Sequence, residues 1–277
     1  MPAAVAEKLG ITAVPLKVIL AGKTFDSSLS KLSIGNESFY NVLRSGVSVK
    51  TASPSIDDYE RYFRKQLDKG KDVLYLGFSS ALSGAFNVSL IAAEDLAEEY
   101  PERKIICVDT LCASMGLSML IYHCVRRQQD GATIEEVRDF AQATKGRISH
   151  WFTPSDLNFL KRGGRLSAAA AAVGSVMNIK PVLKSDETGK LKVIYKARGR
   201  RLAIAKLVEQ MNNNYFPDGS DTVFVTHADC PEDAELLARS ITKNYGISNV
   251  MISEIGPALG AHCGPDTLAL FYLGDVK

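Results

Sequence analysis

The sequence predicts an α/β protein of two domains: a first domain built on a parallel-rich sheet, and a smaller second α/β domain. Two observations predict this class. Through the first half, short apolar runs alternate with amphipathic helical segments, the pattern of β-α units that cover a parallel sheet on both faces. From about Arg147 the pattern changes to short strands, a hairpin turn and an alanine-rich segment. We therefore expect domains at residues 1–147 and 148–277.

Hydrophobic periodicity places the elements of the first domain. Ser55 and Asp58 resemble a capping box ahead of its third helix, and the residue before Pro54 is expected to be extended. A polar connection is expected at residues 22–35. We expect helices at residues 2–9, 37–43, 56–69, 85–100, 113–129 and 134–144, and strands at residues 12–20, 73–78 and 104–108.

The central unit of this domain is a strand, a small-residue turn and a helix. The turn contains Ser79, Ser80, Ser83 and Gly84, and the helix begins at Ala85. Hydroxyls and free backbone N–H groups at a helix N-terminus form a site for a phosphate or a carboxylate. The alternative is that Ser83 only caps the helix. On this segment alone, the cap is the better interpretation.

The second domain is expected to contain shorter elements. Residues 186–189 predict a hairpin turn between two strands. We expect strands at residues 150–152, 180–184, 191–196, 222–226, 250–254 and 267–272, and helices at residues 155–161, 167–176, 202–213 and 231–244.

Length and composition indicate an ordinary globular protein. The 277 residues are enough to bury a full hydrophobic core, and 46% hydrophobic with 23% charged residues exclude a disordered chain. The net charge of +2, without a long basic run, gives no sign of a nucleic-acid surface. The one basic cluster, residues 192–201, is interpreted as a solvated face or a docking patch.

The cysteines and the apolar stretches indicate a cytoplasmic protein. Five cysteines without a C-x-x-C pair argue against a disulfide framework or a zinc site, and favour a reducing compartment. No apolar stretch is long enough to span a bilayer, and residues 1–20 lack a signal-peptide core. The sequence also contains no P-loop, G-x-S-x-G, H-E-x-x-H or dinucleotide fingerprint. We therefore expect no metal and no cofactor.

His262 is the histidine whose context suggests a function. It lies between two expected strands in a segment, taken as a loop, with three glycines that allow the backbone to approach a ligand closely. Imidazole can donate to a carboxylate near neutral pH. The sequence alone does not decide between a histidine that only supports the fold and one that binds a ligand. His123, His150 and His227 lack such a context, and we expect them to be structural.

Two arginines and two hydroxyl residues are further candidates. Arg162 and Arg165 bracket two glycines directly after an expected helix. Arginine binds carboxylates and phosphates with two donors at once, whereas a cation at a helix C-terminus followed by a glycine cap explains one arginine without any function. Thr51 and Ser53 lie on an extended segment ahead of a helix, as caps or as hydroxyl donors.

Together these segments resemble the DegV family of bacterial fatty-acid-binding proteins. The set spans most of the chain in the family's order and spacing, which makes it specific where one segment alone would be weak. The matching segments are TASPS at residues 51–55, SSALSGAFN at 79–87, VDT at 108–110, FLKRGGRLS at 159–167 and GAHCGP at 260–265.

The resemblance implies a non-catalytic carrier. A long-chain fatty acid would lie in a tunnel at the junction of the two domains, and a separate kinase subunit would phosphorylate its carboxylate. Transient contact with a membrane surface is compatible with this role. By resemblance, Thr51, Ser53, Ser83, Gly84, Arg162 and His262 would bind the ligand, and Arg165 would lie at the surface where the kinase docks.

The chain departs from the family pattern at several positions. The family's first strand, which ends in Asp-Ser, is missing before the helix at residues 2–9. Ala85 and Phe86 replace a threonine and a tyrosine, Cys263 stands where threonine is common, and Asp266 where glycine is common.

Two other functions fit parts of the pattern. A hydrolase or acyltransferase could use Ser83 as nucleophile and His262 as base, with Asp109 or Asp266 as a candidate for the orienting acid. A lipid sensor would bind the same ligand without a kinase partner.

Overall fold

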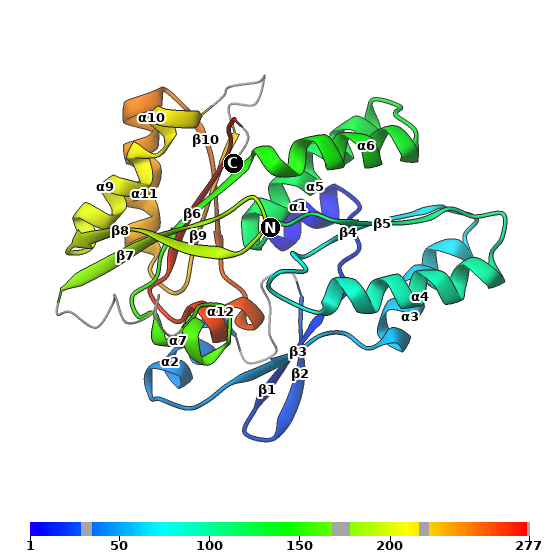
Figure 1. Cartoon of the computed structure of the whole chain (residues 1–277), viewed down its shortest axis with the longest axis horizontal. Coiled ribbons are helices and arrows are strands. Elements are labelled where there is room, and N and C mark those ends of the chain that lie inside the picture. The colour runs from blue at the N-terminus through cyan, green and yellow to red at the C-terminus, as the bar shows by residue number, and fades with distance from the viewer. Residues whose placement is uncertain (29–34, 168–177, 216–221, 276–277) are drawn as a thin grey trace.

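The chain is described by a computed structural model that covers residues 1–28, 35–167, 178–215 and 222–275 (Figure 1). Its described strands form a three-stranded sheet, a two-stranded sheet and a six-stranded sheet. Helices pack against these sheets, which confirms the α/β class. The alanine-rich helix expected at residues 167–176 lies outside the described residues, apart from Ser167.

The three-stranded sheet belongs to the start of the chain and is antiparallel, in the order β2-β1-β3. Its strands are β1 (Leu16–Leu20), β2 (Lys23–Ser27) and β3 (Lys50–Ala52). The sequence analysis missed β2, because Phe25 is its single large apolar residue. The turn from β1 to β2 uses Ala21 and Gly22, both with positive φ, as two-residue hairpins require. The helix α2 (Asn36–Arg44) follows and buries Phe39 and Tyr40.

The parallel pairing expected in the first half is present between β4 (Val73–Gly77) and β5 (Ile105–Asp109). On one face of this pair lie α3 (Ile56–Leu67) and α4 (Ala85–Glu99) (Figure 1). The predicted capping box of Ser55 and Asp58 is confirmed at the start of α3, where each residue's side chain accepts from the backbone N–H of the other. The short α1 (Ala3–Lys8) precedes β1.

The six-stranded sheet occupies the second half in the order β10-β9-β11-β6-β7-β8. Only β9 and β10 pair in parallel among its described strands, so this sheet is mixed. Every residue of β9 and of β11 is buried, as expected for strands covered on both faces. The strands are β6 (Ile148–Thr153), β7 (Ile179–Ser185), β8 (Leu191–Arg198), β9 (Thr222–His227), β10 (Asn249–Glu254) and β11 (Leu268–Leu273).

Two helical layers cover this sheet. On one face lie α9 (Arg200–Glu209) and α11 (Pro231–Tyr245), with the short α10 (Met211–Asn214) beside them. On the other lie α5 (Ser114–Gln129) and α6 (Ile134–Thr144), whose core also includes Leu74 and Leu76 of β4. This second layer is therefore shared by the two-stranded and six-stranded sheets (Figure 1). The boundary at residue 147 stays a prediction.

Candidate functional site

A cavity of about 210 Å³ lies where the three-stranded sheet, the β4–α4 turn and the six-stranded sheet meet. Most of its wall is apolar, and one group of its lining side chains is polar. The apolar lining includes Leu16, Phe78, Leu82, Phe152, Leu160, Leu191, Ile255, Leu259, Ala269 and Phe271. The polar lining includes Thr51, Ser53, Ser83, Ser114, His150, Arg165, Ser185, His262 and Thr267.

His262 and Thr51 meet in this cavity although 211 positions separate them in the chain. The Nε2 atom of His262 lies 2.6 Å from the hydroxyl oxygen of Thr51. The segment expected to be a loop is the helix α12 (Pro257–Cys263), with Pro257 in its first turn. The loop prediction was wrong because Gly260 within the segment lowers its helix propensity, whereas tertiary packing decides the outcome.

The glycines of α12 make room for protein side chains. A Cβ at Gly260 would lie 2.7 Å from the hydroxyl of Tyr40 in α2. A Cβ at Gly264 would overlap the ring of Phe159, and Gly264 also has a φ of 79°. Phe159 belongs to the short helix α7 (Asn158–Arg162). The segment is thus held between α2 and α7, and the glycine requirement comes from that packing.

Ser83 reaches the cavity from the turn before α4. Its hydroxyl lies 3.5 Å from that of Ser53 and accepts a hydrogen bond of 3.2 Å from the backbone N–H of Ala85. Ser83 is therefore not the N-cap residue of α4, which is Gly84, but its hydroxyl bonds the first residue of the helix and also lines the cavity. Its role at a carboxylate stays a prediction. Ser53 and Thr51, two residues apart on an extended segment, face the same side.

The electrostatic environment keeps His262 neutral. Burial, followed by the positive charge of Arg165, lowers the pKa of His262 to about 4. Its Nδ1 atom is buried and has no hydrogen-bond partner among the described residues. A Cβ at Gly163 would overlap this atom. The sequence analysis missed Gly163 as a residue that shapes the site, although the pair of glycines between two arginines was the signal for it.

The two arginines are placed differently from the expectation. Arg165, expected at the surface, is half-buried and lines the cavity, because its guanidinium donates to the carbonyl oxygens of Leu82 and Gly163. Arg162, expected at the ligand, is exposed and outside the cavity lining, because its guanidinium lies over the ring of Phe159 at 4.6 Å from the ring centroid. Arg165 thus lies at the cavity, where we expected Arg162, and Arg162 lies at the surface, where we expected Arg165.

The acid expected for a hydrolase is not beside His262. Asp109 accepts from the hydroxyl of Ser80 at 2.5 Å, and Asp266 accepts from Arg44 at 2.8 Å. His150, expected to be structural, does line the cavity; its Nδ1 contacts the carbonyl of Ile148 and its Nε2 accepts from the backbone N–H of Ala113. Over the described ranges, no three His, Cys, Asp or Glu side chains are grouped so that they could hold a metal ion.

A sequence model of one family, described as "Uncharacterised protein, DegV family", matches residues 1–275. The chain belongs to the DegV family. A DegV domain-containing protein of Clostridium perfringens is 40% identical over 241 residues, which cover 87% of this chain and 83% of that relative.

Solved DegV structures share the fold. A DegV lipid-binding protein of Thermotoga maritima is 27% identical, and the match covers 100% of this chain and 95% of the other with a TM-score of 0.87. A DegV family protein of Thermus thermophilus, whose structure is described as fatty acid binding, is 26% identical over 99% of this chain and 95% of its own, with a TM-score of 0.85. These likenesses confirm the two-domain α/β DegV fold. None of the helices in the described parts of this DegV chain has the length and apolar character needed to cross a membrane.

Proposed function

We propose that this chain binds a long-chain fatty acid in the cavity, with the carboxylate held at Thr51, Ser83 and His262. The observation that carries the proposal is two pairs of polar side chains, Thr51 with His262 and Ser53 with Ser83, in a cavity wall that is otherwise mostly apolar. The lipid and fatty-acid binding described for the Thermotoga and Thermus relatives supports the same ligand class.

The polar group suits a carboxylate. An ionised carboxylate only accepts hydrogen bonds and has about four lone-pair positions. The hydroxyls of Thr51, Ser53 and Ser83 can donate to it, and the guanidinium of Arg165 supplies a positive charge in the same wall. His262, neutral in the cavity, can donate from one ring nitrogen, and a bound carboxylate would raise its pKa.

The apolar wall supplies the affinity. At about 0.8 kcal/mol for each buried CH₂ group, a chain of roughly sixteen carbons offers on the order of 10 kcal/mol before ordering costs. The cavity of about 210 Å³ is smaller than the roughly 300–1,000 Å³ of pockets for drug-sized ligands. A long acyl chain therefore requires lining side chains to move apart when it enters.

We infer further that the chain presents this carboxylate to a separate kinase subunit for acyl-phosphate formation, without a catalytic residue or cofactor of its own. The family resemblance supports this role. Arg162 is the arginine that is exposed, three positions from the cavity-lining Arg165. In the proposal Arg162 is the docking cation and Arg165 belongs to the ligand site, and a cytoplasmic location follows from the kinase's need for ATP.

Extraction tests the binding directly. Purified protein is extracted into organic solvent and analysed by mass spectrometry, and stripped protein is titrated with oleate. We expect a long-chain fatty acid in the extract and saturable uptake of one oleate per chain. No lipid in the extract and no uptake on titration would defeat the proposal. Capture of a kinase subunit in a pull-down then separates a carrier from a lipid sensor.

The geometry does not favour the hydrolase. The hydroxyl of Ser83 accepts from Ala85, and neither Asp109 nor Asp266 contacts His262. A fluorophosphonate probe is therefore expected to leave Ser83 unlabelled.

A further inference from the structure

The helix α2 carries a stripe of three polar residues, Asn36, Tyr40 and Arg44, at a spacing of four. Residues at this spacing lie on one face of a helix. Each donates to a residue that is 185 or more positions away in the chain. The side-chain amide of Asn36 donates to Glu254 at 2.5 Å, and the hydroxyl of Tyr40 donates to the carbonyl of Ile255 at 2.6 Å. Asn36 and Tyr40 therefore fasten α2 to the chain just before α12.

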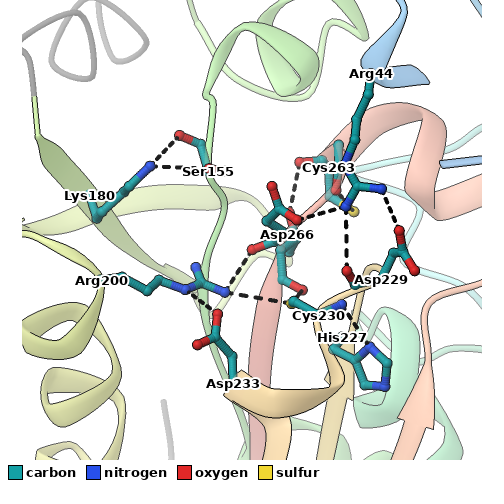
Figure 2. A network of polar contacts seen from close by, with 12 residues as sticks. Arg44, Ser155, Lys180, Arg200, His227, Asp229, Cys230, Asp233, Cys263 and Asp266 are labelled. Atoms are coloured by element: carbon teal, nitrogen blue, oxygen red, sulfur yellow. Dashed lines mark hydrogen bonds and ion pairs between the residues drawn. The ribbon is translucent and has the colours of Figure 1, made fainter. Parts of the chain in front are cut away.

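Arg44 fastens the other end of α12. Its guanidinium donates to the carboxylates of Asp229 and Asp266, the latter at 2.8 Å (Figure 2). Asp266 follows α12 and adopts a φ of 59°, a conformation that glycine adopts without strain. The backbone of Asp266 is also fixed, since its N–H donates to Ala228 at 2.7 Å.

This network is continuous with the turn beside His262. The backbone carbonyl of Asp266 accepts from Arg200 at 2.7 Å, and Arg200 also binds Asp233 (Figure 2). The hydroxyl of Thr267 donates to the carbonyl of Cys263, the residue after His262, at 2.8 Å. The chain on both sides of α12 is therefore tied to α2. Because β3, which carries Thr51, follows α2 in the chain, α2 links the segments that carry His262 and Thr51.

We propose that the stripe Asn36–Tyr40–Arg44 and its partner Asp266 are positioning residues, which set the distance between His262 and Thr51. The inference rests on the proposed function for its effect on ligand affinity. α12 has only seven residues, and a helix this short does not hold its place by itself. Its position comes from its packing against Tyr40 of α2 and Phe159 of α7, and from the polar contacts at its two ends.

Three variants test the role. Asp266→Gly removes the carboxylate at a backbone conformation that glycine adopts without strain, Arg44→Met removes both ion pairs, and Tyr40→Phe removes the buried hydrogen bond to Ile255. Arg64→Met is the matched control, because Arg64 forms an equally exposed ion pair with Glu99 away from the cavity. The first readout is the ring signal of His262 in NMR spectra of ligand-free, histidine-labelled protein, assigned with His262→Gln. The second is the Kd for oleate.

We expect each of the three variants to shift the His262 ring signal, and the control to leave it in place. The Kd for oleate should rise roughly threefold to fivefold for Asp266→Gly and Arg44→Met, and roughly tenfold for Tyr40→Phe, which leaves a buried carbonyl without its donor. Arg44→Lys should restore part of the affinity, since it keeps the charge but loses the two-donor geometry.

An unchanged His262 signal in Asp266→Gly and Arg44→Met would overturn the inference, even if Tyr40→Phe unfolds. A shifted signal with the oleate Kd unchanged in both would also overturn it. Absence of oleate binding by the unmodified protein would instead overturn the proposed function, while the ligand-free signal would still report on the stripe.

Discussion

Ser83 and His262 lie on the same cavity but are held by different means. Ser83 is fixed mainly by its own turn, because its hydroxyl accepts from Ala85 at the start of α4, a helix of 15 residues that buries Ala92 and Leu96 against α3 and β4. Arg165 adds a distant contact, to the neighbouring carbonyl of Leu82. His262 lies on a helix of seven residues that is held by Tyr40, Phe159 and Gly163 from other parts of the chain. From this comparison we expect distant substitutions to disturb the His262 side of the site more than the Ser83 side.

The largest effect is expected from a substitution that disrupts the packing around α12. Gly264→Ala forces a Cβ into the ring of Phe159 at a φ of 79°, and we expect it to lower the free energy of unfolding by about 2–4 kcal/mol. Gly199→Ala is the matched control, because Gly199 has a φ of 85° and a ψ of 163°, close to the 79° and 168° of Gly264, and a Cβ there would make only an ordinary contact with Asn178 at 3.8 Å. The control should lose about 1 kcal/mol. Equal losses in urea unfolding would show that packing against Phe159 contributes nothing.

The second largest effect is expected when the polar side chains of both Ser83 and His262 are removed from the cavity. Ser83→Ala combined with His262→Ala should raise the Kd for oleate about thirtyfold to hundredfold, because two hydrogen bonds to a charged group are lost. Isothermal titration measures it. Ser80→Ala is the control in the same turn, since Ser80 bonds Asp109 and does not line the cavity. A comparable loss in Ser80→Ala would contradict the assignment.

The third effect is a pH dependence of the stability of the folded chain, and it concerns His262 alone. The pKa of His262 is lowered to about 4 in the folded chain, against about 6.5 in an unfolded chain. The unfolded chain therefore binds more protons between these values, and stability falls as the pH drops from 6.5 towards 4. We expect His262→Gln to remove about 1–2 kcal/mol of the loss between pH 7 and pH 4.5. Identical pH profiles for the two proteins would contradict the buried, neutral histidine.

The smallest effect on binding concerns the exposed arginine. Arg162→Ala should change the Kd for oleate by less than about twofold, because an exposed cation outside the cavity contributes little. In an assay with the kinase subunit and ATP, the same variant should form acyl phosphate more slowly. Arg165→Ala should weaken oleate binding itself. If Arg162→Ala instead weakened oleate binding and Arg165→Ala slowed only acyl-phosphate formation, the roles expected from the sequence would be correct.

The sequence predicted those parts of the site that local signals define. The strand at Val73, the small-residue turn and the helix from Ala85 are all present, because apolar periodicity and a serine-glycine turn specify them locally. The hydroxyl residues Thr51, Ser53 and Ser83 and the histidine His262, singled out from their local context and then by the family resemblance, all line the cavity.

Other features depend on contacts that a single sequence does not contain. The helix α12 was taken as a loop because its glycines are explained only by Tyr40 and Phe159. The positions of Arg162 and Arg165 were exchanged because an arginine reaches either side of a glycine turn, and the carbonyl of Leu82 decides which one turns inward. The strand β2 was missed because it shows one large apolar residue.

The most direct test is a crystal structure of the chain with oleate. We expect the carboxylate oxygens within about 2.6–3.2 Å of the hydroxyl of Ser83 and of Thr51 or His262, with the acyl chain between Phe152 and Phe271 and the lining side chains moved apart. A carboxylate bound elsewhere, or oleate on the surface above an unchanged cavity, would contradict the account.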